Sequence, residues 1–303
     1  MSTVTKGVRN LTPEQLGISE PGKSLDSPHK KKVSGFTPSV ATDDPILQRV
    51  IELIDDGFAG VILEGSPGTG KSWYAKEIAY HLTSGNFNNV ISIQFHPGYQ
   101  YEEFIEGYVP DGNGGFKKQP MAFLNACTLA KDTDDSVVLI IDEFSRADTA
   151  RVFGEALTYL EKTKRDQELT LASGSKISIP DNLVILATMN PWDRGVEELD
   201  LALERRFAKL KVNPDIDILK KFISNSEVSD SIGQKLIQFF HITSSNKNPL
   251  CRIGHAYFSR ITTEESLRRV WENQLLFHFE KALRNDEEEL NKIKSAWERI
   301  FTS

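Results

Sequence analysis

The sequence predicts an α/β fold, in which a parallel sheet lies between two layers of helices and a small all-helical domain follows. Two observations lead to this prediction. Five short apolar runs alternate with helical stretches, and no such run follows Pro214. Runs of this kind are typical of strands buried on both faces of a parallel sheet. They occupy residues 60–64, 90–95, 137–141, 183–188 and, more weakly, 208–212.

Length and helical spacing divide the chain further. A chain of 303 residues corresponds to about two domains of ~150 residues each. We expect a disordered tail over residues 1–43, an α/β domain over 44–213 and a helical domain over 214–303. Apolar residues at helical spacing predict one helix near 46–54, before the first strand, and another over 73–81. Four more are predicted after the sheet, over 218–223, 231–240, 264–283 and 287–300.

Composition excludes several classes of protein. Two cysteines rule out a disulfide framework and fit a reducing compartment. No apolar run approaches the ~20 residues of a membrane span, so we expect a cytoplasmic protein without a membrane partner. The net charge of −7 argues against a surface that binds nucleic acid throughout, but it does not exclude a local basic groove.

A glycine-rich segment directly after the first strand matches G-x-x-x-x-G-K-[ST]. Such a loop folds into a concave nest whose N–H groups point at phosphate oxygens, and the helix after it directs its positive dipole end at the same anion. Lys71 can reach the β- and γ-phosphates, and the Ser72 hydroxyl can bind Mg²⁺. The sequence therefore predicts a nucleotide site built from Gly65, Ser66, Pro67, Gly68, Thr69, Gly70, Lys71 and Ser72.

Two adjacent carboxylates, Asp142 and Glu143, end the third apolar run. Ligands of open α/β sheets bind at the carboxyl ends of the strands. Asp142 therefore suits the Mg²⁺ shell and Glu143 suits polarisation of an attacking water. Taken alone, the pair would also fit a helix cap, but the phosphate loop upstream favours the catalytic interpretation.

Two polar groups follow the later strands. Asn190, after the fourth run, can bind a γ-phosphate or the attacking water from a rigid strand, or it can simply form a turn before Pro191. Arg205 and Arg206 close a helix predicted over 196–204 and have no obvious partner in their own chain. We interpret them as cations offered to another molecule, with compensation of the helix dipole as the alternative.

The order of these motifs resembles the AAA+ superfamily of P-loop NTPases, and four segments resemble its dynein-related, McrB-like branch. They are QFHPGYQYEEF at 94–104, LIIDEFSRA at 139–147, MNPWDR at 189–194 and IGHAYF at 253–258. The resemblance implies a P-loop NTPase three-layer parallel sheet, the AAA+ core, with a helical lid. It makes Asn190 a sensor residue and either Arg205 or Arg206 an arginine finger that acts in a neighbouring subunit. It also makes Asp193, Arg194, Arg146 and His255 candidates for interface or sensor positions.

The resemblance further implies a ring, expected to be a hexamer, that hydrolyses a nucleoside triphosphate with Mg²⁺. ATP is the expected substrate because most members of the superfamily use it, and GTP, which McrB hydrolyses, is the alternative. Residues 163–166 fit the guanine-reading pattern [NT]-K-x-D, but they do not end a predicted core strand. Alternating apolar and polar residues predict a hairpin over 169–179, which the resemblance would direct into the ring pore and which could equally be an ordinary surface hairpin.

Three functions stay open. The first is a motor subunit of a McrBC-like defence system with a McrC-like nuclease partner, which would contact DNA only through assembly or that partner. The second is a MoxR-type chaperone that remodels proteins or aids cofactor insertion. The third is a scaffold gated by nucleotide. The McrB-like segments favour the first.

Overall fold

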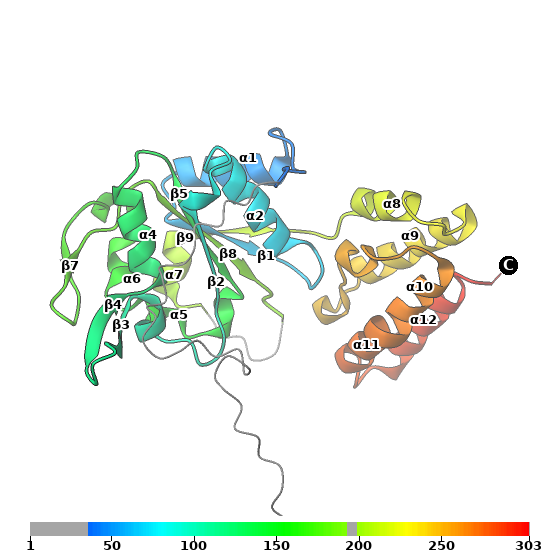
Figure 1. Ribbon diagram of the computed structural model, residues 1–303. Coiled ribbons are helices and arrows are strands. Elements are labelled where there is room, and N and C mark those ends of the chain that lie inside the picture. The colour runs from blue at the N-terminus through cyan, green and yellow to red at the C-terminus, as the bar shows by residue number, and fades with distance from the viewer. Residues whose placement is uncertain (1–35, 193–198, 303) are drawn as a thin grey trace, which may run out of the picture.

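A five-stranded parallel sheet forms the centre of the computed structural model, which describes residues 36–192 and 199–302 (Figure 1). The strand order is β2-β5-β8-β1-β9, and all neighbouring strands run parallel. The α/β sheet predicted from the apolar runs is confirmed. The strands are β1 (Gly60–Glu64), β2 (Val90–Gln94), β5 (Val137–Asp142), β8 (Leu183–Met189) and β9 (Phe207–Lys211).

Alternate residues of these strands enter two separate cores, as the period of two requires. On one face, Val61 of β1 and Val138 of β5 pack against α1 (Pro45–Asp55) and α2 (Lys71–Leu82). On the other face, Ile62 and Leu139 pack against a layer rich in phenylalanine. That layer contains α3 (Tyr101–Phe104), α4 (Ala122–Lys131), α5 (Thr149–Phe153) and α6 (Ala156–Tyr159).

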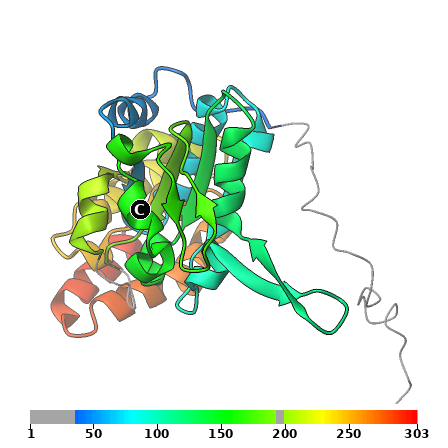
Figure 2. The same ribbon diagram turned by 90° about the vertical axis from the view of Figure 1, so that its left-hand side faces the viewer.

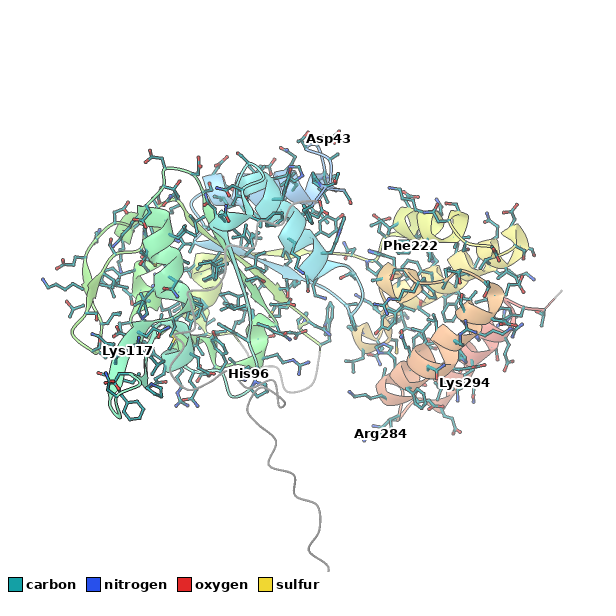
Figure 3. The ribbon with its side chains drawn as sticks, viewed as in Figure 1. Asp43, His96, Lys117, Phe222, Arg284 and Lys294 are labelled. Carbon is teal, nitrogen blue, oxygen red and sulfur yellow. The ribbon has the colours of Figure 1, made fainter. Side chains whose placement is uncertain are left out.

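Two hairpins extend from the second layer. The predicted hairpin is present as β6 (Leu169–Thr170) and β7 (Lys176–Ile177), with Gly174 in the turn at φ +84°. A longer one, β3 (Glu106–Pro110) with β4 (Phe116–Pro120), was not predicted as a hairpin. Figure 2 shows it extending away from the sheet, and Figure 3 shows Lys117 on it. Since β4 is exposed along its whole length, it carries no buried face that a sequence pattern could reveal.

Between the sheet and residue 302, where the described part of the chain ends, the regular elements are helices. They are α8 (Ile216–Ser224), α9 (Asp230–Ser244), α10 (Glu264–Val270), α11 (Leu276–Ala282) and α12 (Glu287–Glu298), and a π-helical segment Trp271–Leu275 joins α10 to α11. Their core is separate from the two cores of the sheet and is centred on Phe239, Trp271 and Trp297, with the two indole rings stacked. Short 3-10 segments connect the elements at Phe87–Asn89, Phe144–Arg146, Lys162–Lys164, Pro249–Cys251 and His255–Phe258.

The helix before β9 is shorter than predicted. Residues 199 and 200 are not helical, and α7 (Leu201–Arg206) begins where the Asp200 carboxylate accepts a hydrogen bond from the Ala202 N–H at 2.7 Å. The predicted tail lies outside the described residues over positions 1–35. Among the described residues, no helix combines the length and the apolar character that crossing a membrane requires.

Candidate functional site

The glycine-rich loop connects β1 to α2 at the carboxyl end of the sheet. Gly68 and Gly70 have φ values of +77° and +84°, which L-residues with side chains rarely adopt. The Thr69 hydroxyl donates to the Ser66 carbonyl at 3.1 Å and stabilises the curve of the loop. This backbone has the concave form that binds phosphate at a helix N-terminus.

Lys71 folds back over this loop. Its Nζ donates to the Gly65 and Ser66 carbonyls at 3.0 and 2.9 Å. Burial lowers the pKa of Lys71, while the carboxylates of Glu143 and Asp142 act in the opposite direction. The ammonium group is therefore held against the loop backbone, within electrostatic reach of Glu143 and Asp142.

Three oxygen-bearing side chains meet beside the loop. The Ser72 hydroxyl donates to Asp142 Oδ1 at 2.8 Å, and the hydroxyl of Thr188 on β8 donates to the same oxygen. Hydroxyl and carboxylate oxygens next to a phosphate nest fit Mg²⁺, which takes one or two protein ligands and completes its shell with phosphates and water. Within residues 36–192 and 199–302, no group of three His, Cys, Asp or Glu side chains could hold a metal without such help.

Glu143 has an unusual backbone. Its φ of +55° is rare for a residue with a side chain, and such conformations cluster at functional sites. Its N–H donates to the Thr188 hydroxyl at 3.3 Å, and its carboxylate accepts from Arg146 Nε at 3.2 Å. The backbone of Glu143 is thus tied to β8, and its side chain is held by Arg146.

Asn190 follows β8 directly. Its Oδ1 accepts a hydrogen bond from the Trp192 N–H at 3.3 Å, which leaves the Nδ2 hydrogens as its donors. Asn190 therefore forms the expected turn before Pro191, and its Nδ2 can still donate to a ligand. Asn190 and Pro67 line one cavity of about 260 Å³ together with helical-domain residues. Asp193 and Arg194 lie outside the described residues.

The two candidate finger arginines lie at the opposite end of the sheet. The Arg206 carbonyl accepts from the Ala59 N–H just before β1 begins, whereas the phosphate loop follows the end of β1. A five-residue strand spans about 16 Å. Neither arginine can therefore reach the phosphate loop of its own chain.

The expectation that these arginines lack a partner in their own chain was wrong. Glu161 accepts a hydrogen bond from Arg205 and forms an ion pair with Arg206 at 2.8 Å. Arg206 is buried and also donates to the Ala202 carbonyl at 2.7 Å, whereas the side chain of Arg205 is 71% exposed. The contact with Glu161 forms only when two segments that are distant in the sequence meet, so no local sequence pattern predicts it.

The helical domain touches the phosphate loop directly. The backbone N–H groups of Gly254 and Ala256 donate to the Pro67 and Gly68 carbonyls, both at 2.9 Å. The approach is so close that a methyl group on Gly254 would overlap Gly68. Between these two donors, His255 is buried, and its Nδ1 accepts from the Asp215 N–H at 3.1 Å. Burial lowers the pKa of His255, with the Asp215 carboxylate acting in the opposite direction.

A cavity of about 620 Å³ lies between the phosphate loop, residues 39–44 and the helical domain. Trp73, Tyr74 and Phe222 give it aromatic walls, and Figure 3 shows Phe222 on the side of the helical domain that faces the sheet. Asp44 and Asp215 supply carboxylates; burial and these two charges raise the pKa of Tyr74 to about 12. Aromatic walls with a few polar groups are typical of a pocket for a flat organic ligand.

Buried Glu77 of α2 holds one wall of this cavity. Its carboxylate accepts from the Ser39 and Val40 N–H groups at 2.8 and 3.1 Å, and His81 contacts the Val40 carbonyl at 2.8 Å. Sequence reasoning did not find this contact. The available signal was a carboxylate on the apolar face of the helix that follows the phosphate loop.

The segment 163–166 does not read a base in this chain. Arg165 is buried, and its guanidinium donates to the carbonyls of Leu160, Pro180, Leu183 and Ala59. Ala59 and Leu183 lie at the amino ends of β1 and β8, the end of the sheet away from the phosphate loop. The guanine-reading alternative for this segment is therefore wrong.

The chain is similar to known proteins of one family. The family profile of the AAA domain (dynein-related subfamily) matches residues 60–207. The chain is 33% identical over 269 residues to the type IV methyl-directed restriction enzyme EcoKMcrB subunit of Escherichia coli (strain K12), covering 82% of this chain and 58% of that protein. It is 30% identical over 188 residues to the type II restriction enzyme BsuMI component YdiS of Bacillus subtilis (strain 168), covering 48% and 55%.

The chain thus spans less than two thirds of the length of both relatives. A crystal structure from Cytophaga hutchinsonii ATCC 33406 is 16% identical and covers 83% of this chain and 88% of that chain, with a TM-score of 0.38. That degree of overlap is too low to bear on function.

Proposed function

Because this chain belongs to the dynein-related, McrB-like branch of the AAA+ P-loop NTPases, we propose that it hydrolyses a nucleoside triphosphate as a ring-forming motor subunit. One observation carries the proposal. Lys71, Ser72 and Asp142 converge at the carboxyl end of the sheet, beside a backbone nest that fits phosphate. Glu143 follows Asp142 directly, so an acid that can orient water lies next to the phosphate position.

Each residue of the site has a separate role in the proposed reaction. The N–H groups of the loop from Gly65 to Ser72 hold the phosphates, and Lys71 leaves the loop carbonyls to contact the β- and γ-phosphates. Ser72 and Asp142 would hold Mg²⁺, which supplies charge neutralisation of the β- and γ-oxygens when bound. Glu143 orients and deprotonates the attacking water, and Asn190 donates from Nδ2 to the γ-phosphate or to that water.

Arg205 is our candidate for the cation that acts in a neighbouring site. Its exposure and its position at the end of the sheet opposite its own loop support action between subunits. Arg206 is buried against Glu161, so we assign it the role of anchoring the end of α7. This requirement for a neighbour supports a closed ring, proposed to be a hexamer.

The cavity of about 620 Å³ next to Gly70 is proposed to take the nucleotide base. Trp73 and Phe222 would contact the flat faces of the base, while Asp44 and Asp215 accept from its amino groups. Both purines carry amino donors, and we propose ATP as the substrate, with GTP as the alternative.

We propose further that the motor works in a McrBC-like restriction system with a nuclease partner. Both curated relatives are named as components of restriction enzymes. Contact with DNA would arise through the ring or through the partner. The β6–β7 hairpin stays a candidate for contact with the motor's load, because Leu169 and Leu171 anchor its base in the core while its turn is exposed.

A hydrolysis assay tests the proposal. The protein is incubated with ATP or GTP, with Mg²⁺ or EDTA, with and without DNA, over a wide range of protein concentrations. We expect Mg²⁺-dependent phosphate release whose rate per subunit rises steeply with protein concentration, because the site needs a neighbour. Phosphate release that is absent under all conditions, or that persists in EDTA, would contradict the NTPase assignment. A rate per subunit that does not change on dilution would contradict the ring.

A further inference from the structure

Strand β8 carries one hydroxyl in an otherwise apolar run. All seven of its residues, Leu183–Met189, are buried, and Thr188 is 2% exposed. Burying a hydroxyl is unfavourable unless it is hydrogen-bonded, and valine would fill the same volume without that cost. A buried hydroxyl at position 188 must therefore be stabilised by its hydrogen-bond partners.

Those partners are the two acidic residues at the end of the neighbouring strand. Ile141 of β5 lies opposite Ala187 of β8, so the next residues, Asp142 and Thr188, lie side by side. The Thr188 hydroxyl donates to Asp142 Oδ1 and accepts from the Glu143 N–H at 3.3 Å. One side chain thus contacts the carboxylate of the first acid and the backbone of the second.

The same carboxylate oxygen also accepts from Ser72 at 2.8 Å. Two hydroxyls, one from α2 and one from β8, therefore fix the rotation of the Asp142 carboxylate and leave Oδ2 for other partners. Because the N–H of Glu143 is bonded to the same threonine, the φ of +55° at Glu143 is held by β8 as well.

We propose that Thr188 is a positioning residue for Mg²⁺ binding, which holds Asp142 in the orientation that the metal requires and fixes the backbone that presents Glu143. The inference rests on the proposed function, since it assigns Asp142 to the metal shell. Residues that orient a metal ligand typically contribute about 10- to 100-fold to metal affinity. Removing the hydroxyl should therefore weaken Mg²⁺ binding while the phosphate loop still binds nucleotide.

The test measures binding without turnover. Full-length protein with Thr188→Val is titrated with the fluorescent non-hydrolysable analogues mant-AMPPNP and mant-GMPPNP, first in EDTA and then at increasing Mg²⁺. In EDTA, we expect a nucleotide affinity within about twofold of that of the wild type. The Mg²⁺ concentration at the midpoint of the titration, the Mg²⁺ midpoint, should rise by about 10-fold or more. Thr188→Ser, which keeps the hydroxyl, should restore the midpoint.

Thr243→Val is the matched control, because Thr243 is also fully buried but donates only to helix carbonyls in α9. Its midpoint should equal that of the wild type. If Thr188→Val does not fold, Thr188→Cys gives the same reading, since a thiol keeps the volume and is a weak donor. A midpoint for the folded variant within twofold of the wild type overturns the inference. Wild-type protein that binds neither analogue would instead overturn the proposed function.

Discussion

The Ser72 hydroxyl lies 2.8 Å from Asp142 Oδ1, although 70 positions separate the two residues in the chain. This contact joins the helix that follows the phosphate loop to the strand that ends in two acids. It forms because β1 and β5 flank β8 in one parallel sheet, so that their carboxyl ends open on the same edge. The chemistry of the site follows from this convergence.

Glu143→Gln should stop turnover and leave nucleotide binding intact. The amide keeps the size of the side chain but cannot accept the proton of the attacking water. We expect the hydrolysis rate to fall by about 10²- to 10⁴-fold, with a nucleotide Kd within about twofold of the wild type. Steady-state phosphate release and equilibrium binding are the two measurements. Glu168→Gln, which removes an exposed ion pair with Lys176 on a hairpin, should leave both quantities unchanged.

Arg205→Ala and Arg206→Ala should have different effects. Arg205 is exposed, so its loss should leave the melting temperature unchanged and lower hydrolysis by about 10³- to 10⁵-fold if it acts as an arginine finger. Arg206 is buried against Glu161, so its loss should lower the free energy of unfolding by about 1–3 kcal/mol. Thermal unfolding and phosphate release separate the two roles.

A mixing experiment decides whether Arg205 acts between subunits. Arg205→Ala subunits keep an intact site, and Glu143→Gln subunits keep the arginine, so a mixed ring joins the two at some interfaces. Mixing two inactive proteins should therefore restore part of the hydrolysis. If activity does not return although the subunits assemble together, the assignment of Arg205 to a neighbouring site is wrong.

The central strands β1, β5 and β8 could be predicted because they are buried on both faces. Runs such as 137–141 contain only apolar residues, and each of the five predicted runs overlaps a strand of the structure. The β3–β4 hairpin could not be predicted in this way, since Tyr108 and Phe116 are 69% and 72% exposed and β4 has no buried face. Its residues give no alternation from which a strand could be read.

The candidate site could be predicted in part, for a similar reason. Lys71 and Ser72 belong to a local motif, and Asp142 and Glu143 stand directly after an apolar run. The contacts of Thr188 and Glu161 depend on which strands and loops become neighbours, and that information is in the sheet order rather than in any short segment. The roles of the site residues remain predictions that the experiments above test.

Gly254→Ala should weaken the contact between the helical domain and the phosphate loop. The added methyl group would overlap the Gly68 backbone, which cannot move without disturbing the nest. Overpacking of this kind typically costs about 1–3 kcal/mol, so we expect a lower melting temperature together with weaker nucleotide binding. Gly98→Ala is the control, because only the His96 ring comes near, at 3.6 Å. A Gly254→Ala variant that melts and binds like the Gly98→Ala variant would show that the close approach is unimportant.

Acid should destabilise the protein through His255. Burial lowers its pKa in the folded state below the ordinary value of 6.5, so the unfolded chain binds the proton more readily. The stability contributed by the neutral ring is therefore present above about pH 6.5 and is lost as the pH falls through the lower, folded-state pKa. Protonation also removes the acceptor for the Asp215 N–H at 3.1 Å. We expect the melting temperature to be level from about pH 8 to pH 7 and to fall from about pH 6.5 to pH 5.5.

His255→Asn, which keeps an acceptor but cannot titrate, should make that fall shallower, whereas His241→Asn at an exposed position should not. Equal slopes in the two variants would mean that other groups, such as His278, whose pKa burial also lowers, account for the acid sensitivity.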